Sequence, residues 1–418
     1  MQNSNQNLLV EYITLANHYN LEKKDYKKAI EYYEKYVELD KTKAVVFNIL
    51  ANLYSKVYGD NSLKRQLECY EAANLVKPND RLILHGLAFC SEKLNRKEEA
   101  DKYYKQLLQI NPTPTDYYNY GGFLIHNGDF KNGHKYFAYR NLIDNEVFKN
   151  TLTPNIESLE KLKNIADKAV LVHYEQGFGD TIMYSRFVPA LKEKAKKVIF
   201  VVQEELLGLI KNSSIFKNII VISNKEDLSQ IQYDLPLMLL DTPLLVNADS
   251  SNLPYADGYL EVNYNNSLNI SQKFKIGIAY SGDKSANYSG RDVGIKFFKS
   301  LLKIDNVELY SLQKDADICE GIIPLGQDFK NFTDTACAIK NMDLIISTDN
   351  VILNLAGALG VRTIGLFNNQ TNYRWFKLKD NTGWYKSIMP IQAKQQNDWV
   401  PVFEKLQEIV TEIVRNGK

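Results

Sequence analysis

Three short polar segments carry residues that could bind or transfer a charged group, and each follows an apolar run typical of a buried strand. The first segment, residues 175–180, reads EQGFGD. Its glycines Gly177 and Gly179 let the backbone approach a ligand, and the helix that follows offers unpaired N–H groups. Asp180 is the carboxylate at this helix start, so it could act as the N-cap or as a general base.

The second segment, Ser347-Thr348-Asp349-Asn350, lies between the apolar run DLIIS and the helix pattern VILNLAGALG. Asp349 and Asn350 are typical cap residues. A helix start behind a buried parallel strand also suits a diphosphate. The types of these two residues leave both roles open: they could only cap the helix, or they could also contact a ligand.

The third segment follows the run KIGIAYS and contains Ser281, Lys284 and Arg291. Lysine and arginine neutralise phosphate groups, although a solvated loop is the plain alternative. Gln313 and Lys314 follow the next apolar run, VELYSLQ. Polar residues at three strand ends predict a binding site for an anion more strongly than any one of them does.

The sequence shows no pattern for metal or triad chemistry. It contains no HExxH pair, no GxSxG motif and no Walker loop, and four of its five histidines lie before residue 150. Its four cysteines form no CxxC pair, which argues against a structural zinc site. We therefore expect no metal and no cofactor.

Alternating apolar runs and helix patterns must position these segments. From residue 165 onward, runs at 169–174, 198–202, 218–222, 235–240 and 259–262 predict strands separated by helices. The alternation restarts with runs at 275–281, 307–313, 343–347 and 362–367. This pattern predicts two α/β halves with parallel sheets, at 151–268 and 269–418, and a ligand site at the carboxyl ends of their strands.

Residues 1–150 have a different pattern, which repeats. Pro78 and Pro112 are 34 positions apart, the tetratricopeptide period. Small residues recur where paired helices should cross, at Ala16, Ala51, Ala88 and Gly122. The fold class predicted for the chain is therefore α followed by α/β, a helical repeat domain joined to the two halves.

Aligning the repeats on these small residues predicts a polar groove. Flanking positions that fall on one helix face are rich in amides, and the candidates are Asn17, Asn48, Asn52, His85 and Asn119. Side-chain amides can hydrogen-bond a peptide backbone without reading its sequence, and the concave face of stacked repeats presents such a surface. An ordinary solvated helix face is the alternative.

Composition narrows the class of protein. The 418 residues carry a net charge of +1, which gives no sign of a nucleic-acid partner. The N-terminal stretch lacks the pattern of a signal peptide, and no run is long and apolar enough for a membrane helix. These observations predict a cytoplasmic globular protein.

At these motifs the chain resembles bacterial tetratricopeptide-repeat proteins that carry a heptosyltransferase-like glycosyltransferase domain, an architecture similar to O-GlcNAc transferase. The resemblance rests on VLVHYEQGFGDTIMYSRF, IGIAYSGDKSANYSGRDVGIKFF, YSLQKD, DTACAIKNMDLIISTDNVILNLAGALGVRTIGLF, YRWF and WY. The segment NGDFKNGHKYFAYR resembles the family's join between repeats and enzyme. The resemblance implies a GT-B fold, a nucleotide-sugar donor and no metal.

The resemblance also implies roles for single residues. It places the catalytic base at Asp180, the contacts to the donor diphosphate at Asp349, Asn350 and Asn354, and a basic donor contact at Arg291, with Lys284 as a second. The strand-end residues Gly179, Ser281, Gln313 and Lys314, taken from their own types and positions, complete the predicted donor site. The chain departs from the family at the diphosphate loop. Asn350 replaces a hydroxyl residue, Val351 a small residue and Asn354 a histidine.

The resulting hypothesis is an inverting, metal-independent glycosyltransferase that moves a sugar from a nucleotide-sugar to a protein docked on the repeats. Flagellin or another surface protein is the acceptor that the resemblance suggests. Two alternatives stay open: an enzyme acting on lipid-linked or cell-wall glycans, and a repeat scaffold without activity. An oligomer is compatible with each.

Overall fold

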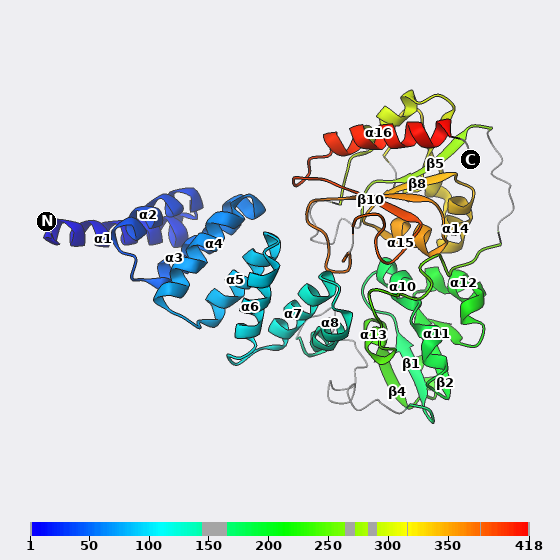
Figure 1. Cartoon of the computed structure of the whole chain (residues 1–418), viewed down its shortest axis with the longest axis horizontal. Helices are drawn as coiled ribbons and strands as arrows, with labels where there is room; N and C mark the ends of the chain where they lie inside the picture. Colours follow the sequence, from blue (N-terminus) through cyan, green and yellow to red (C-terminus); the bar gives the residue numbers. More distant parts are fainter. Residues whose placement is uncertain are drawn as a thin grey trace. The chain divides into compact units, whose positions relative to one another are not determined.

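The computed structural model of the chain describes residues 2–143, 165–263, 272–282, 291–315, 317–376 and 378–416. The chain divides into two compact units, Met1–Tyr120 and Gly121–Lys418, drawn in Figure 1. The predicted boundaries at 150 and 268 lie outside the described residues. The predicted order, helical repeats followed by parallel α/β structure, is confirmed.

The first unit is built from antiparallel helix pairs. Helix α1 (Gln2–Asn17) packs on α2 (Tyr26–Leu39), α3 (Ala44–Tyr58) on α4 (Leu63–Val76), and α5 (Arg81–Lys93) on α6 (Lys97–Leu107). Helix α7 (Pro114–His126) follows, and the unit ends within it. Ala16, Ala51 and Ala88 are fully buried, as their spacing predicts.

Aromatic side chains fill the space between successive pairs. Gly86 on α5 faces the Tyr70 ring of α4, and a Cβ atom at Gly86 would lie 2.4 Å from that ring. A larger residue would therefore push the two pairs apart. Aspartates cap the helix starts, since Asp80 accepts hydrogen bonds from the Leu82 and Ile83 N–H groups.

The second unit contains two parallel sheets among its described residues. The first has the strand order β3-β2-β1-β4, with strands β1 (Ala169–His173), β2 (Lys197–Val202), β3 (Ile220–Ser223) and β4 (Leu235–Met238). The second has the order β10-β9-β8-β5-β6-β7. Its strands are β5 (Phe274–Ala279), β6 (Val307–Ser311), β7 (Ile322–Pro324), β8 (Leu344–Thr348), β9 (Thr363–Phe367) and β10 (Ile388–Gln392).

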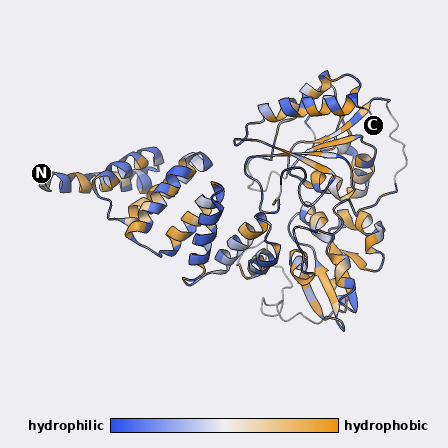
Figure 2. Cartoon of the chain, in the orientation of Figure 1, coloured by the Kyte–Doolittle hydropathy of each residue, from blue (hydrophilic) through white to orange (hydrophobic). Residues whose placement is uncertain are grey.

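Helices connect the strands of both sheets. The first half contains α10 (Phe178–Ser185), α11 (Val188–Lys192), α12 (Glu204–Asn212) and α13 (Thr242–Leu245). The second contains the 3₁₀ helix η8 (Ile295–Lys303) and the α-helices α14 (Phe332–Lys340), α15 (Val351–Ala358) and α16 (Val400–Arg415). Apolar residues concentrate in the strands of both sheets (Figure 2), which fits parallel strands covered on both faces.

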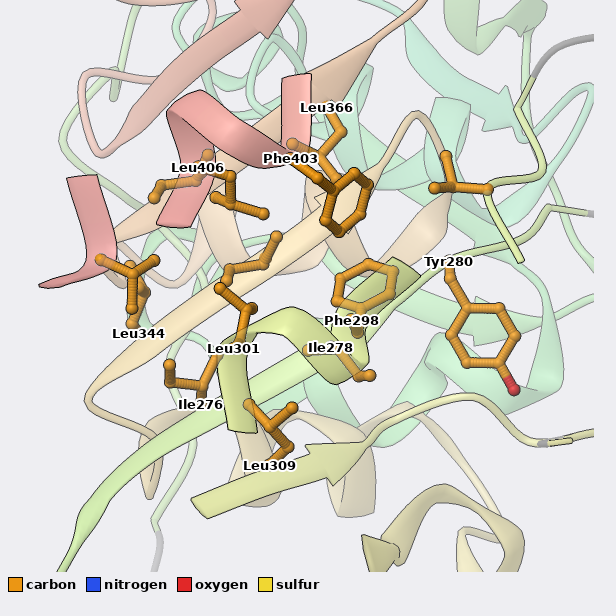
Figure 3. Packing of buried hydrophobic residues seen from close by; sticks show 14 of the residues in the cluster. Ile276, Ile278, Tyr280, Phe298, Leu301, Leu309, Leu344, Leu366, Phe403 and Leu406 are labelled. Carbon is orange, nitrogen blue, oxygen red and sulfur yellow. The ribbon is translucent and has the colours of Figure 1, made fainter. Parts of the chain in front are cut away.

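Alternate residues of the second sheet serve two cores. Ile276, Ile278, Ile346 and Ile364 pack against η8 and α16, and Figure 3 shows Phe298 and Leu301 meeting Phe403 and Leu406 there. Ile345 and Gly365 alternate with these residues, so they face the opposite side. A Cβ atom at Gly365 would lie 3.3 Å from Leu353 of α15, so α15 covers that opposite face.

Three details differ from the predicted elements. Residues 259–262, predicted as a strand, form none, because the N–H groups of Tyr259 and Leu260 donate to the Ala358 carbonyl at the end of α15 instead. Strands β7 and β10 were not predicted, since both are short edge strands and β10 contains a proline. The predicted helix at 294–304 is the 3₁₀ helix η8.

A buried arginine ties the start of the second unit to its first sheet. Arg140, in the 3₁₀ helix η3 (Ala138–Leu142) behind α8 (Phe130–Phe137), is fully buried. It donates to Glu175 Oε2 at 3.0 Å and Oε1 at 2.5 Å, and to Asp241 Oδ1 at 2.6 Å. Glu175 Oε1 also accepts the Leu240 N–H at 2.8 Å. The network therefore holds the loop after β1, which leads to Asp180.

Arg140→Ala should lower the free energy of unfolding of the second unit by about 3–5 kcal/mol, because it leaves two carboxylates buried without a cation. All three tryptophans, Trp375, Trp384 and Trp399, lie in this unit. Urea unfolding followed by tryptophan fluorescence therefore reports on it alone. Lys386→Ala is the matched control, since it breaks an exposed pair with Asp257 (2.8 Å) and should cost at most about 1 kcal/mol. Equal effects of the two variants would contradict the assignment.

Candidate functional site

A pocket of about 640 Å³ lies where the strand ends of the second unit meet. Residues 177–180 reach it after β1, Ser281 after β5, Gln313 after β6 and Asp349 after β8. The volume suits a small-molecule ligand. Because the carboxyl ends of parallel strands share one edge of a sheet, polar residues far apart in sequence converge here.

The pocket brings together most of the residues predicted to act on a donor. Those that line it are Gly179, Asp180, Ser281, Arg291, Gln313, Lys314, Asp349, Asn350 and Asn354. Lys284 lies outside the described residues. The predicted donor site requires these side chains to lie together, and they do. Their individual roles stay predictions.

Helices α10 and α15 pack directly against each other at the pocket floor. A Cβ atom at Gly179 would lie 3.2 Å from Asn354 Nδ2 and 3.8 Å from Val351 Cα. A glycine at this position therefore lets the two helices approach closely. Asn354 is buried, donates to the Asn350 carbonyl at 3.2 Å and accepts from the Tyr385 hydroxyl at 3.4 Å.

Asp180 lies in the first turn of α10, two residues after the helix begins. The N-cap residue is Gly177, so the role of N-cap considered for Asp180 is wrong by three positions. Its Oδ2 accepts the Gly177 N–H at 3.3 Å. Its Oδ1 lies 2.5 Å from Arg374 Nη1 as an ion pair, in a geometry that is not a hydrogen bond.

The surroundings of Asp180 make its carboxyl group a stronger base than one in water. Burial raises the pKa of Asp180 above its ordinary value, while Arg374 and, more weakly, Arg291 act in the opposite direction. Asp349 adds a second negative charge nearby and raises the pKa further. A carboxylate with these neighbours is suited to accept a proton within the pocket.

Arg291 lines the pocket next to the helix start of α15. Its Nη1 donates to the Asp349 carbonyl at 3.4 Å, and its guanidinium carbon would lie 3.8 Å from a Cβ atom at Gly282. The guanidinium therefore lies beside both the loop after β5 and the start of α15, where an anion would meet its charge and the helix dipole together.

Asn350 is the N-cap of α15, as one of its two predicted roles requires. Its Oδ1 accepts from the Ile352 and Leu353 N–H groups at 2.9 and 3.3 Å and from Ser347 Oγ at 2.9 Å. Its Nδ2 donates to the Ser281 carbonyl at 3.1 Å. The side chain also lines the pocket, but these bonds already occupy its oxygen and its amide nitrogen.

Arg374 is a pocket residue that the sequence did not predict. It belongs to the motif YRWF, and only the fold brings the loop after β9 to Asp180. An aromatic contact among the pocket residues was also not predicted: the rings of Phe178 and Phe332 lie 4.9 Å apart. Phe178 immediately follows Gly177 in the quoted glycine segment, so its position there was a usable signal.

The predicted groove residues lie on the first unit, exposed or half-buried. Asn17 Oδ1 accepts from the Tyr33 hydroxyl at 2.6 Å, and Asn52 Oδ1 from the Tyr70 hydroxyl at 3.1 Å. In both pairs the amide of the first helix meets a tyrosine of the second. These two amides therefore also bind the helices of one repeat together.

His85 and Asn119 join neighbouring repeats. The His85 Nε2 and Asn119 Nδ2 atoms lie 3.2 Å apart, which places the predicted residues of α5 and α7 in contact. Asn48 on α3 is half-buried. The five residues thus continue from α1 to α7 along the repeats.

Within the described residues, no three histidine, cysteine, aspartate or glutamate side chains gather as a metal site would require. The helices of this same part of the chain include none that is long and apolar enough to cross a membrane.

The family model of the tetratricopeptide repeat matches residues 12–43 and 83–114. These segments are tetratricopeptide repeats. The first match covers the end of α1 and all of α2, and the second covers most of α5 and all of α6, which includes the repeat unit predicted up to Pro112. A search of curated protein sequences found no match.

Solved structures resemble each part of the chain. The repeats are similar to the MamA protein, with 15% identity, 32% of this chain and 73% of MamA covered, and a TM-score of 0.30. The remainder is similar to a glycosyl transferase of family 9 from Veillonella parvula, with 12% identity, coverage of 59% and 90%, and a TM-score of 0.42. The iron-containing dodecameric glycosyltransferase TibC from enterotoxigenic E. coli is similar at 9% identity, coverage of 60% and 76%, and a TM-score of 0.43.

Asn350→Ala should lower the free energy of unfolding of the second unit by about 0.5–2 kcal/mol, because two backbone N–H groups of α15 lose their acceptor. Urea unfolding followed by tryptophan fluorescence measures it. Asn350→Ser keeps an accepting oxygen at the N-cap and, like alanine, loses the Nδ2 bond to the Ser281 carbonyl, so it is the matched control and is expected to be closer to the parent. If alanine and the parent are equally stable, Asn350 is not needed as a cap.

Proposed function

We propose that the chain is an inverting, metal-independent glycosyltransferase of the GT-B type, which uses a nucleotide-sugar as donor. One observation carries the proposal: Asp180, a buried carboxylate with a raised pKa, shares a pocket with Arg291 and the start of α15. A base and an anion site in one pocket are the two groups that such a transfer needs. The sequence motifs named above support the same assignment.

In the proposed reaction, an acceptor oxygen or nitrogen attacks the anomeric carbon of the sugar. The bond from this carbon to the diphosphate breaks, and the diphosphate leaves with the bonding electrons. Asp180 takes the proton of the attacking atom. Arg291 and the N–H groups at the start of α15 stabilise the charge on the leaving diphosphate. A single displacement inverts the anomeric carbon.

The donor would lie mainly on the second half, since Ser281, Gln313, Lys314 and Asp349 all follow strands of that sheet. Asn354, in place of the histidine that the resemblance implies, is hydrogen-bonded to Tyr385 and to the α15 backbone. Its role would therefore be to hold the start of α15 in shape.

The acceptor would be a protein or peptide held by the repeats. The amide-rich set Asn17, Asn48, Asn52, His85 and Asn119 supports this, because it continues along successive repeats with exposed or half-buried side chains. An enzyme acting on lipid-linked or cell-wall glycans and an inactive repeat scaffold are the competing hypotheses. A donor-hydrolysis assay separates the scaffold from the enzymes.

Asp180→Asn should lower turnover about 10²–10⁴-fold, because it removes the base, while the variant should still bind nucleoside diphosphate. Arg291→Ala should instead weaken nucleoside diphosphate binding, by about 1.5–3 kcal/mol, because a hydrogen bond from a charged group is lost. Calorimetry and a sugar-transfer assay give the two readouts. Turnover of Asp180→Asn within threefold of the parent would remove Asp180 from the mechanism.

Asn48→Ala combined with Asn52→Ala should slow glycosylation of a long protein acceptor and spare donor hydrolysis, because the amides would hold the peptide backbone. Asn52 also accepts the Tyr70 hydroxyl. Tyr70→Phe removes that internal bond and keeps both amides, so it is the matched control and should retain acceptor activity. If the double variant and the parent transfer sugar at equal rates, the amides do not hold the acceptor, and the repeats would serve only in assembly.

A further inference from the structure

Arg374 is fixed at its backbone and at Nε, and its charged end forms an ion pair with Asp180. The Trp384 Nε1–H donates to the Arg374 carbonyl at 2.6 Å, and the Arg374 N–H donates to Asn372 Oδ1 at 3.2 Å. The same Asn372 oxygen accepts from Arg374 Nε at 3.0 Å. The loop after β9 thus fixes where the arginine begins and leaves its two terminal nitrogens to the pocket.

These two terminal nitrogens have room for another partner. Nη1 forms an ion pair with Asp180 Oδ1 at 2.5 Å, and Nε is the guanidinium nitrogen that donates a hydrogen bond, to Asn372, among the described residues. A guanidinium carries five N–H donors in a planar fork, and phosphate oxygens match that fork. The Arg374 side chain is 14% exposed and lines the pocket, so a bound anion can reach it.

The charges around Asp180 balance before a ligand binds. Arg374 comes from the loop after β9, Arg291 from the loop before η8 and Asp349 from the end of β8. Tyr184 follows one turn later on α10 itself. Two guanidinium groups and two carboxylates sum to zero, so a diphosphate adds negative charge that the guanidinium groups must then share.

We propose that Arg374 couples the binding of a phosphate-bearing ligand to the protonation of Asp180. The arginine is the counter-ion of Asp180 in the free protein, and it turns toward the phosphate when the ligand enters. Asp180 then loses part of its counter-ion inside a buried site and binds a proton more tightly. Arg374 is thus a positioning residue that makes Asp180 a stronger base when the leaving group is in place. The inference rests on the proposed function for the identity of the ligand.

Linkage fixes the sign of the effect. If binding raises the proton affinity of Asp180, protons are taken up on binding at a pH near its pKa, and affinity rises as the pH falls through that range. The phosphate groups titrate as well, so the part due to Asp180 is the difference between the parent and Asp180→Asn. That difference must disappear when Arg374 cannot respond.

The test is calorimetry of inorganic pyrophosphate, ADP, UDP and GDP in two buffers of different ionisation enthalpy, repeated over a series of pH values. The parent should take up more protons than Asp180→Asn. Arg374→Gln should bind about 10–100-fold more weakly, the loss of a charged hydrogen bond, and should show no excess uptake. Arg374→Lys keeps the charge without the fork and should retain part of the uptake. Lys386→Gln, at the exposed pair with Asp257, is the control and should match the parent.

Equal proton uptake by the parent and Asp180→Asn would overturn the inference, as would full uptake by Arg374→Gln or no binding of any of the four probes. Tryptophan fluorescence checks the fold of each variant. The proposed function is tested separately. If proton uptake is observed but no donor is hydrolysed or transferred, the Arg374–Asp180 coupling is supported and the glycosyltransferase function is rejected. If sugar is transferred but no excess proton uptake is observed, the function is supported and the coupling is rejected.

Discussion

The close approach of helices α10 and α15 is the constraint on which the candidate site depends. Gly179 has no side chain, and a Cβ atom there would lie 3.2 Å from Asn354 Nδ2. The contact joins an element that follows the first sheet to one within the second. It brings Asp180 near Asp349, Arg291 and Arg374, and without it the base and the anion site would belong to separate surfaces.

Further contacts hold α10 and α15 in place. A Cβ atom at Gly357 would lie 2.4 Å from the Tyr385 ring, so that tyrosine packs directly on α15, and its hydroxyl donates to Asn354. On the other side, Arg140 holds Glu175 and, through it, the loop that leads into α10. The second unit begins at Gly121, so the residues that make these contacts fold with the site and not with the preceding repeats.

Local patterns in the sequence were enough to predict most of the fold and which polar side chains lie together in one pocket. Apolar runs predicted the central strands, because buried parallel strands must be apolar on both faces. Polar residues at the ends of these runs predicted the pocket, because the carboxyl ends of parallel strands meet at one edge. The prediction failed for residues 259–262, whose N–H groups bond to the end of α15, a partner remote in sequence.

Arg374 could not be predicted for a similar reason. Its type and spacing in YRWF give no sign that it reaches Asp180, since this contact depends on how the loop after β9 folds against Trp384 and Asn372. The two roles open to Asn350 also required the structure, which shows its oxygen accepting from two helix N–H groups. Side-chain pairing between distant segments is decided by packing, which local patterns do not contain.

The most direct test of the account is a crystal structure of the chain with ADP, UDP or GDP bound. The diphosphate should lie in the pocket against Arg291 and the start of α15, in the same pocket as Asp180. A nucleoside diphosphate bound elsewhere on the chain, with this pocket left to water, would contradict it.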